Sequence, residues 1–260
     1  MNTQPIGLFD SGVGGTSIWK EINALLPYEN TLYLADSKNA PYGTHSKEKI
    51  IELSIKNTQY LVNKGCKIIV IACNTATTNA IAVLRKQFNI PIIGIEPAIK
   101  PAALKTQTKA VGILATKGTL SSALFHQTTD LYATGITIIE RIGEGLVQLI
   151  EDGKIESEEM TALLKLYTKP MVDSNIDYLV LGCTHYPYLI PQLLKLLPKN
   201  INIIDSGMAV AKHTKATLES NNLINPNTTS SENIFYINIK NTQTMASLIG
   251  KNKKVDYLDF

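Results

Sequence analysis

Short runs of apolar residues recur along the chain, and a segment of helical length follows each of them. The runs are rich in Ile, Val and Leu with little polar alternation, which is typical of strands buried on both faces. The strands predicted in this way are Ile6–Phe9, Thr31–Ala35, Lys67–Ala72, Ile92–Ile95, Ala110–Ala115, Ile136–Glu140, Tyr178–Leu181 and Ile201–Ile204. Their alternation with helices predicts an α/β fold with doubly wound, mostly parallel sheets.

The segment Ser46–Lys64 illustrates the predicted helices. Ser46 is a favourable N-cap residue, and Gly65 marks the end of the helix. We expect one face of this helix to be buried against a sheet. The apolar positions near that face are Ile51, Ile55 and Leu61.

Two parts of the chain resemble each other. In Ile68–Thr75 a buried strand is followed by Ala-Cys-Asn-Thr, and in Tyr178–His185 a similar strand is followed by Gly-Cys-Thr-His. A weaker similarity relates Gly7–Ser11 to Gly112–Thr116. The alternative interpretation is that this similarity is no greater than that between any two strand–helix units.

The repeat predicts two pseudosymmetric α/β domains with the active site in the cleft between them. Residues 1–97 together with 208–260 would form the first domain, and 98–207 the second. The boundary is expected near Pro97–Pro101, and the chain would return to the first domain after Asp205.

Composition narrows the class of protein. The chain has 260 residues, of which 44% are hydrophobic and 18% charged, as is usual for a globular protein large enough to bury a core. We expect no membrane span, because no window approaches roughly 18 apolar residues. The first residues lack the pattern of a signal peptide, and three cysteines are too few for a disulfide framework. A cytoplasmic protein with reduced thiols is therefore expected.

The net charge of +3 does not indicate a nucleic-acid partner. Arg85 and Arg141 are the only arginines, and the lysines are scattered. Specific nucleic-acid recognition relies on arginine for bidentate contacts to bases and phosphates. We therefore expect a small-molecule partner and no nucleic acid.

Polar residues gather where predicted strands end. The four clusters are Asp10–Gly12, Cys73–Thr75, Thr116–Thr119 and Cys183–His185. In open parallel sheets ligands bind beyond the carboxyl ends of the strands. These four clusters are therefore the candidate ligand site.

The glycine-rich segment Gly12–Gly15 does not match a nucleotide-binding pattern. Ser17 stands where the third glycine of GxGxxG would be, and the Walker pattern is absent. Asp10 would repel an approaching pyrophosphate. We expect a tight turn whose backbone N–H groups face a smaller anion. A nucleotide-dependent oxidoreductase is the alternative.

The cysteines fall into two classes. Cys66 precedes a strand and is interpreted as a packing residue, whereas Cys73 and Cys183 each end a strand and open a helix. A helix N-terminus lowers a thiol pKa from about 8.5 towards neutrality. Buried structural cysteines are the alternative interpretation.

Two matched thiols favour one kind of chemistry over others. No CxxC or second ligand pair accompanies Cys183 and His185, so we expect no metal site. A cysteine hydrolase needs one thiol and does not explain a second. Two facing thiols suit removal of a proton from one face of a carbon and delivery of a proton to the other.

The motifs, taken in order, resemble those of a known family. They are Phe9-Asp10-Ser11-Gly12-Val13-Gly14-Gly15, Pro41-Tyr42-Gly43, Ala72-Cys73-Asn74-Thr75-Ala76, Glu96-Pro97 and Leu181-Gly182-Cys183-Thr184-His185-Tyr186-Pro187. The chain from Ile6 to about Asp205 resembles the cofactor-independent aspartate/glutamate racemase family. The histidine after Gly-Cys-Thr favours the glutamate branch.

The resemblance implies interconversion of L- and D-glutamate without pyridoxal phosphate, another cofactor or a metal. Cys73 would deprotonate D-glutamate and Cys183 would deprotonate L-glutamate, each acting as the acid in the reverse direction. Asp10 would assist Cys73, His185 would assist Cys183, and Glu151 would be a further assisting group.

The resemblance also implies the substrate contacts. These are Asp10, Ser11, Pro41, Tyr42, Gly43, Asn74, Thr75, Thr116, Thr119, Thr184 and His185. The hydroxyl residues among them are equally explained as helix N-caps. A homodimer that supplies D-glutamate for peptidoglycan is expected. A racemase of another amino acid such as aspartate, or a non-catalytic amino-acid-binding protein, are the alternatives.

Overall fold

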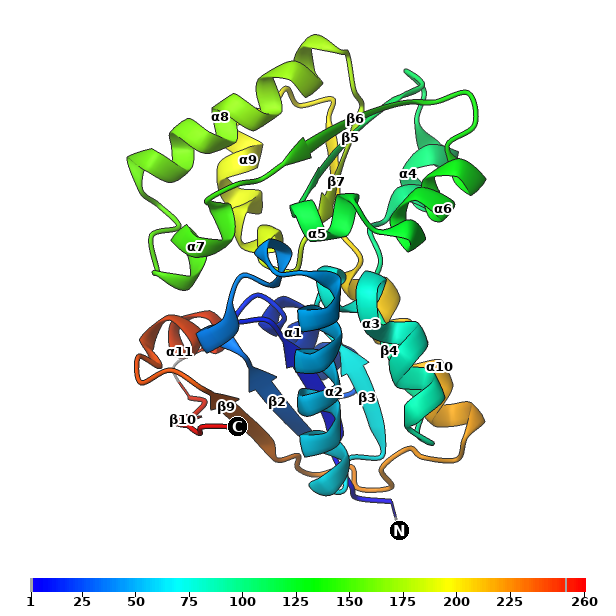
Figure 1. Cartoon of the computed structure of the whole chain (residues 1–260), viewed down its shortest axis with the longest axis vertical. Coiled ribbons are helices and arrows are strands. Elements are labelled where there is room, and N and C mark those ends of the chain that lie inside the picture. The colour runs from blue at the N-terminus through cyan, green and yellow to red at the C-terminus, as the bar shows by residue number, and fades with distance from the viewer. Residues whose placement is uncertain (1, 251) are drawn as a thin grey trace.

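Two parallel sheets form the framework of the protein in a computed structural model that describes residues 2–250 and 252–260 (Figure 1). The first sheet has the strand order β10-β9-β2-β1-β3-β4, and the second has the order β6-β5-β7-β8. The strands are β1 (Ile6–Asp10), β2 (Thr31–Ala35), β3 (Ile68–Ile71), β4 (Ile92–Gly94), β5 (Ala110–Ala115), β6 (Thr137–Ile142), β7 (Tyr178–Gly182), β8 (Asn202–Ile204), β9 (Asn233–Ile237) and β10 (Val255–Tyr257).

Helices cover the sheets and connect the strands. They are α1 (Thr16–Leu25), α2 (Lys47–Asn63), α3 (Asn74–Gln87), α4 (Ile99–Lys105), α5 (Lys117–Leu120), α6 (Ala123–Tyr132), α7 (Leu146–Glu151), α8 (Glu158–Asp173), α9 (Ile190–Leu196), α10 (Gly207–Ser220) and α11 (Gln243–Ile249), with the 3-10 turns η1 (Ser37–Asn39), η2 (Tyr42–Thr44) and η3 (Tyr186–Leu189). Across residues 2–250 and 252–260, no helix combines the length and apolar character that crossing a membrane requires.

The predicted fold class is confirmed. Each of the eight predicted strands is present with its ends shifted by at most two residues, and the strand pairs in both sheets are parallel. The sequence analysis did not predict β9 and β10, which extend the first sheet beside β2. Both are only partly buried and lie towards the edge, so they lack the continuous apolar run of the central strands.

The internal repeat corresponds to a repeated strand order. The first four strands of the chain are arranged β2-β1-β3-β4, and the next four are arranged β6-β5-β7-β8. The segment with Cys73 follows β3 and the segment with Cys183 follows β7, so the two cysteines occupy equivalent positions. The exact domain limits, 1–97 with 208–260 and 98–207, stay a prediction.

Both sheets are covered on two faces, as doubly wound sheets require. Along β1 the side chain of Leu8 packs into the core that includes α1 and α10, and that of Phe9 packs into the core that includes α2 and α3. In the second sheet, α4 and α6 share a core with one face, and α7, α8 and α9 pack on the other. Figure 1 shows α2 and α3 in front of the first sheet.

Helix α2 begins and ends as predicted, but its buried face is rotated. The Ser46 hydroxyl accepts a hydrogen bond from the backbone N–H of Lys49, and Gly65 adopts a φ of 77° just after the helix. Ile51 and Ile55 are half-buried instead of central. The buried residues are Ile50, Leu53, Ser54, Asn57, Thr58 and Leu61. Because half of this face is polar, apolar periodicity alone misplaced it.

A buried ion pair lies at the amino ends of the first sheet. Lys67 Nζ is 2.6 Å from Glu29 Oε2, and both side chains are almost fully buried. Glu29 Oε1 accepts a hydrogen bond from the backbone N–H of Asn225, and Lys67 Nζ donates to the carbonyl of Asn2. The pair thus joins segments that are far apart in the sequence.

Replacing Lys67 by Met is expected to lower the free energy of unfolding by about 3–5 kcal/mol, because it leaves the Glu29 carboxylate buried without its partner. Urea denaturation measures the change. The matched control is Lys169→Met, which removes the exposed pair with Asp173 and is expected to cost about 0.5 kcal/mol or less. Equal losses of the free energy of unfolding in the two variants would contradict the assignment of Lys67 and Glu29 as a buried ion pair.

Candidate active site

All four clusters predicted at the strand ends contribute residues to the wall of one cavity. The two thiols line one small cavity, with Cys73 entering from the first sheet and Cys183 from the second. The other lining residues are Ser11, Pro41, Tyr42, Gly43, Asn74, Thr75, Thr116, Val147, Thr184 and His185. Three predicted site residues, Asp10, Thr119 and Glu151, lie outside this lining set.

The cavity is nearly closed. Its volume is about 10 Å³, close to the roughly 10–15 Å³ that one water needs. A wider hollow of about 580 Å³ adjoins it and shares Pro41, Gly43, Thr116 and Val147 with its wall. The small cavity therefore has no room for an amino acid in the conformation that the structure shows.

Cys73 is the N-cap residue of α3. Its Sγ accepts a hydrogen bond from the backbone N–H of Ala76 at 3.5 Å, and it lies 3.7 Å from the hydroxyl of Ser11. Burial, together with the charge of Asp10, raises the pKa of the Cys73 thiol well above its ordinary value. The predicted lowering by the helix N-terminus is therefore wrong for Cys73, because burial outweighs the N–H group.

Asp10 lies behind Ser11 and is fully buried. Its Oδ2 accepts a hydrogen bond from the backbone N–H of Gly15 at 2.8 Å, and its Oδ1 accepts from Ser11 Oγ at 3.5 Å and from Thr184 Oγ1 at 3.4 Å. Burial raises the pKa of the Asp10 carboxyl. Ser11 thus stands between this carboxyl and the Cys73 thiol.

Cys183 lies against His185. The Sγ atom is 3.7 Å from Nδ1, and both residues are buried. Cys183 precedes the 3-10 turn η3 and not an α-helix, which corrects the prediction that it opens a helix. Burial by itself lowers the pKa of His185, but its hydrogen bonds to Cys183 and Glu151 outweigh burial and raise that pKa well above its ordinary value.

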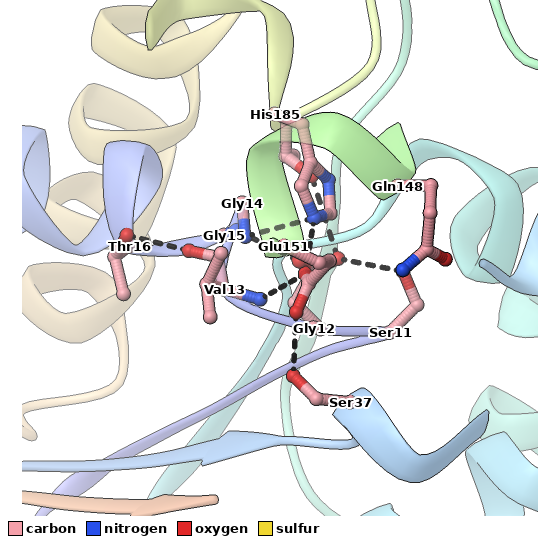
Figure 2. A network of polar contacts seen from close by, with 12 residues as sticks. Ser11, Gly12, Val13, Gly14, Gly15, Thr16, Ser37, Gln148, Glu151 and His185 are labelled. Carbon is pink, nitrogen blue, oxygen red and sulfur yellow. Dashed lines mark hydrogen bonds and ion pairs between the residues drawn. The ribbon is translucent and has the colours of Figure 1, made fainter. Parts of the chain in front are cut away.

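Glu151 joins the second half of the protein to the glycine-rich turn of the first half (Figure 2). Its Oε1 lies 2.6 Å from His185 Nε2 and accepts a hydrogen bond from the backbone N–H of Val13 at 2.6 Å. Its Oε2 accepts from the Ser37 hydroxyl at 2.8 Å. Glu151 therefore contacts His185 and the turn and does not itself line the cavity.

His185 Nε2 has two partners that require different protonation states. It can accept from the backbone N–H of Gly14 at 3.2 Å only when it carries no proton, and it donates to Glu151 only when it carries one. The shorter contact to Glu151 and the raised pKa of His185 favour the protonated ring. In that form Nδ1 also donates towards Cys183.

The glycine-rich turn binds protein groups and not a free anion, which corrects the sequence-based expectation. The N–H groups of Val13, Gly14 and Gly15 point to Glu151, His185 and Asp10, respectively. The close approach of His185 and Glu151 to the turn also explains why glycine occupies positions 14 and 12. A Cβ on Gly14 would lie 2.1 Å from His185 Nδ1, and a Cβ on Gly12 would lie 1.9 Å from Glu151 Oε1.

Three threonine hydroxyls connect the halves beside the cavity. Thr75 Oγ1 lies 2.8 Å from Thr116 Oγ1 and 3.3 Å from Thr119 Oγ1, which are themselves 3.0 Å apart. Thr116 is also the N-cap of α5, so the capping interpretation holds alongside its position in the wall. Thr119 is fully buried behind Thr116.

Asn74 is the polar group in the wall that lacks partners. Its Oδ1 and Nδ2 are both buried, and neither has a hydrogen-bond partner in the protein. Since a buried amide without partners costs free energy, this side chain is a candidate contact for a ligand that both donates and accepts.

Two further observations bear on the predictions. Cys66 is buried, and burial raises its pKa to about 12, in agreement with a packing role. In the part of the chain that the structure describes, no three His, Cys, Asp or Glu side chains are grouped as a metal would require.

The sequence analysis missed Val147, because an apolar residue on a short helix carries no signal that distinguishes a cavity wall from a core.

Known proteins resemble the chain over most of its length. A family model described as Asp/Glu/Hydantoin racemase matches residues 6–214. A glutamate racemase from Stutzerimonas stutzeri is 47% identical over 221 residues, which are 85% of this chain and 84% of that protein. A glutamate racemase from Herpetosiphon aurantiacus is 42% identical over 228 residues, 88% of this chain and 90% of that protein.

A solved structure shows the same fold. The crystal structure of Escherichia coli glutamate racemase in complex with L-glutamate and the activator UDP-MurNAc-Ala is similar with a TM-score of 0.87 and 32% identity. The similarity covers 98% of both chains. The described architecture is therefore that of a known class of racemase structures.

Replacing Gly14 by Ala is expected to lower kcat/KM on the order of 10²-fold, because the added methyl group displaces the His185 ring. Enzyme kinetics and thermal unfolding are measured on the same preparation. The control is Gly65→Ala, which strains the backbone at a positive φ without a neighbour within 4 Å. It should lower the unfolding temperature and leave kcat/KM unchanged. A Gly14→Ala variant with a lowered unfolding temperature and an unchanged kcat/KM would show that Gly14 serves stability alone.

Proposed function

The chain belongs to the Asp/Glu/Hydantoin racemase family, and from that premise we propose that it interconverts L- and D-glutamate by proton transfer at the α-carbon. The observation that carries this proposal is the pair of thiols, Cys73 and Cys183, at equivalent positions of two sheets on one closed cavity. The names of the two glutamate racemases described above and the bound L-glutamate in the Escherichia coli enzyme support glutamate as the substrate.

Racemisation needs one base and one acid on opposite faces of the α-carbon. In the direction from D- to L-glutamate, the Cys73 thiolate takes the α-proton, and the electron pair of the broken C–H bond remains as a carbanion. The Cys183 thiol then delivers its proton to the other face. In the reverse direction Cys183 is the base and Cys73 the acid, so the two thiols share one ionisation.

The surroundings of the two thiols differ. Burial and the charge of Asp10 favour the thiol form of Cys73, whereas Cys183 faces the His185 ring. Turnover needs one thiol and one thiolate, and which cysteine is ionised follows the enantiomer that is bound. The Ser11 hydroxyl connects Cys73 to Asp10, and Glu151 holds His185 in place.

The wall of the cavity binds the amino acid and the developing negative charge. Asn74 offers a free buried donor and acceptor, and the hydroxyls of Ser11, Thr75 and Thr184 stand beside it. Thr116 and the Pro41–Gly43 backbone complete the set, and Thr119 supports it from behind through the hydroxyls of Thr75 and Thr116. Donors fixed in a closed site stabilise a carbanion next to a carboxylate, and one such donor contributes roughly 2.7–4 kcal/mol to the barrier.

The described residues that line the cavity include no arginine. A rigid bidentate clamp would have to suit the α-carboxylate of both enantiomers as the carbon inverts. Hydroxyl, amide and backbone donors adapt to both. Closing of the halves after substrate entry would exclude water and strengthen these contacts.

The cellular role follows from the reaction. The proposal includes a cytoplasmic enzyme that works without a cofactor or metal and supplies D-glutamate for peptidoglycan. It also includes a homodimer as the working form.

Incubation with glutamate in deuterated water is expected to invert the amino acid and exchange its α-hydrogen, because inversion requires loss of that hydrogen. Polarimetry and mass spectrometry measure the two events on both enantiomers. Aspartate, tested in parallel, is expected to remain unchanged. Inversion of aspartate alone would identify a different racemase, and no exchange with either amino acid would indicate a non-catalytic binding protein.

Single-cysteine variants are expected to separate the two faces. Cys73→Ala should lose inversion and exchange of D-glutamate, but Cys183 can still remove and return the proton of L-glutamate. Cys183→Ala should show the reverse. The control Cys66→Ala removes the thiol outside the cavity and should retain inversion. Full inversion by either active-site variant would refute the two-thiol mechanism.

Asp10→Asn is expected to shift the rise of kcat/KM with pH to lower pH. The negative charge of Asp10 raises the pKa of Cys73, so its removal lowers that pKa and produces the thiolate earlier. The maximal rate should nevertheless fall on the order of 10²-fold, because the group that assists proton transfer is lost. Rates across pH values check this, with the buried Asp177 replaced by Asn at the amino end of β7 as control. A profile of kcat/KM against pH that shifts to higher pH, or does not shift, would contradict the pairing of Asp10 with Cys73.

A further inference from the structure

The carboxylate of Asp36 organises a buried polar cluster behind the cavity. Its Oδ2 accepts hydrogen bonds from Tyr42 Oη at 2.5 Å and from Asn57 Nδ2 at 3.4 Å. Its Oδ1 accepts from Asn238 Nδ2 at 2.5 Å and from Asn39 Nδ2 at 2.8 Å. We refer to Asp36, Asn39, Tyr42, Asn57 and Asn238 as the Asp36 cluster.

The cluster ties together segments that lie far apart in the sequence. Asp36 follows β2, and its donors come from η1, η2, α2 and the end of β9. Asn238 also accepts a hydrogen bond from the backbone N–H of Lys38 at 2.8 Å, and its own backbone N–H donates to Ala35. Asn238 therefore connects the C-terminal part of the chain to the segment that leads into Pro41–Gly43.

The Tyr42 side chain transmits this arrangement to the cavity. Tyr42 is buried, and burial together with Asp36 raises its pKa well above the ordinary value, so its hydroxyl stays protonated and donates. The Tyr42–Gly43 segment lines the cavity on its other side. A Cβ on Gly43 would lie 3.0 Å from Thr116 Cβ. A small displacement of this segment would therefore change the cavity wall.

We propose that Asn238, acting through Asp36 and Tyr42, is a positioning residue that holds the Pro41–Gly43 wall at the spacing that substrate binding requires. The inference rests on the proposed function, because it assigns that wall to the amino-acid substrate. Asn238 lies beyond residues 6–214, the part of the chain that the family model matches. The C-terminal segment thus contributes to the site without touching it.

The charges around the cluster are few and can be named. The titratable groups that face it or its immediate neighbours are Tyr42 within it, Cys73 on the cavity side of Tyr42, His45 on the carbonyl of Asn39, Lys38 paired with Asp259, Asp10 whose carbonyl accepts from the backbone N–H of Asp36, and Glu151 on the hydroxyl of Ser37. A second carboxylate next to Asp36 would therefore have Asp36 as its dominant charged neighbour.

The test is Asn238→Asp, which keeps the shape of the side chain but replaces a donor by a second carboxylate. At alkaline pH the two carboxylates repel, and kcat/KM for glutamate is expected to fall 10- to 100-fold, on the order of the effect of a small misplacement. The loss should appear mainly in KM. At lower pH one proton shared by the pair restores a hydrogen bond, so the ratio of variant to wild type should recover.

Two further variants separate positioning from folding. Asn241→Asp adds the same charge at an exposed position nearby and should match the wild type at every pH. Asn238→Ala removes the donor without adding charge, so its kcat/KM should fall with a ratio to wild type that does not change with pH. Circular dichroism and thermal unfolding confirm that each variant is folded.

The outcomes are distinct. An Asn238→Asp enzyme that matches Asn241→Asp, or one whose ratio to wild type stays flat across pH, overturns the positioning role and leaves the proposed function intact. Failure of the wild type to invert glutamate overturns the proposed function and this inference with it. If Asn238→Asp does not fold, a normal KM in the folded Asn238→Ala variant overturns the inference, and a raised KM supports it.

Discussion

Contact between the Gly12–Gly15 turn and the side chains of Glu151 and His185 is the constraint on which the site depends. The turn belongs to the first sheet, and the two side chains come from the second half of the chain. Atoms of Glu151 and His185 occupy the space where a Cβ of Gly12 or Gly14 would stand. The halves approach this closely only because these two glycines carry no Cβ. The N–H groups of Val13 and Gly15 in the turn then satisfy the buried carboxylates of Glu151 and Asp10.

Symmetry of the fold and asymmetry of the environment together suit a racemase. The repeated strand order places Cys73 and Cys183 at matching strand ends on one cavity, and the proposed proton transfers at opposite faces of one carbon need two such groups. Their neighbours do not match. Asp10 raises the pKa of the Cys73 thiol, whereas His185 offers Cys183 a proton donor. The two thiols therefore face different neighbours although their places in the fold are equivalent.

In our proposal the Pro41–Gly43 part of the cavity wall is positioned by the hydrogen-bonded Asp36 cluster. The Asp36 carboxylate receives donors from four elements, one of which follows a strand near the C-terminus. A buried carboxylate with several donors is rigid because each lost hydrogen bond leaves a polar group unsatisfied. In such a cluster Tyr42 alone lines the cavity, and the other four members can fix the Tyr42–Gly43 backbone from outside it.

The amino-acid sequence by itself determined the fold class, the eight central strands, the capping of α2 and the matched cysteines, because each of these depends on local periodicity or on a few adjacent residues. Only the tertiary structure decided the partners of the glycine turn, the raised pKa of Cys73, the polar half of the buried α2 face and the link from Asn238 to Asp36. These features depend on burial and on which distant segments face one another. Neither is encoded in the spacing of residues along the chain.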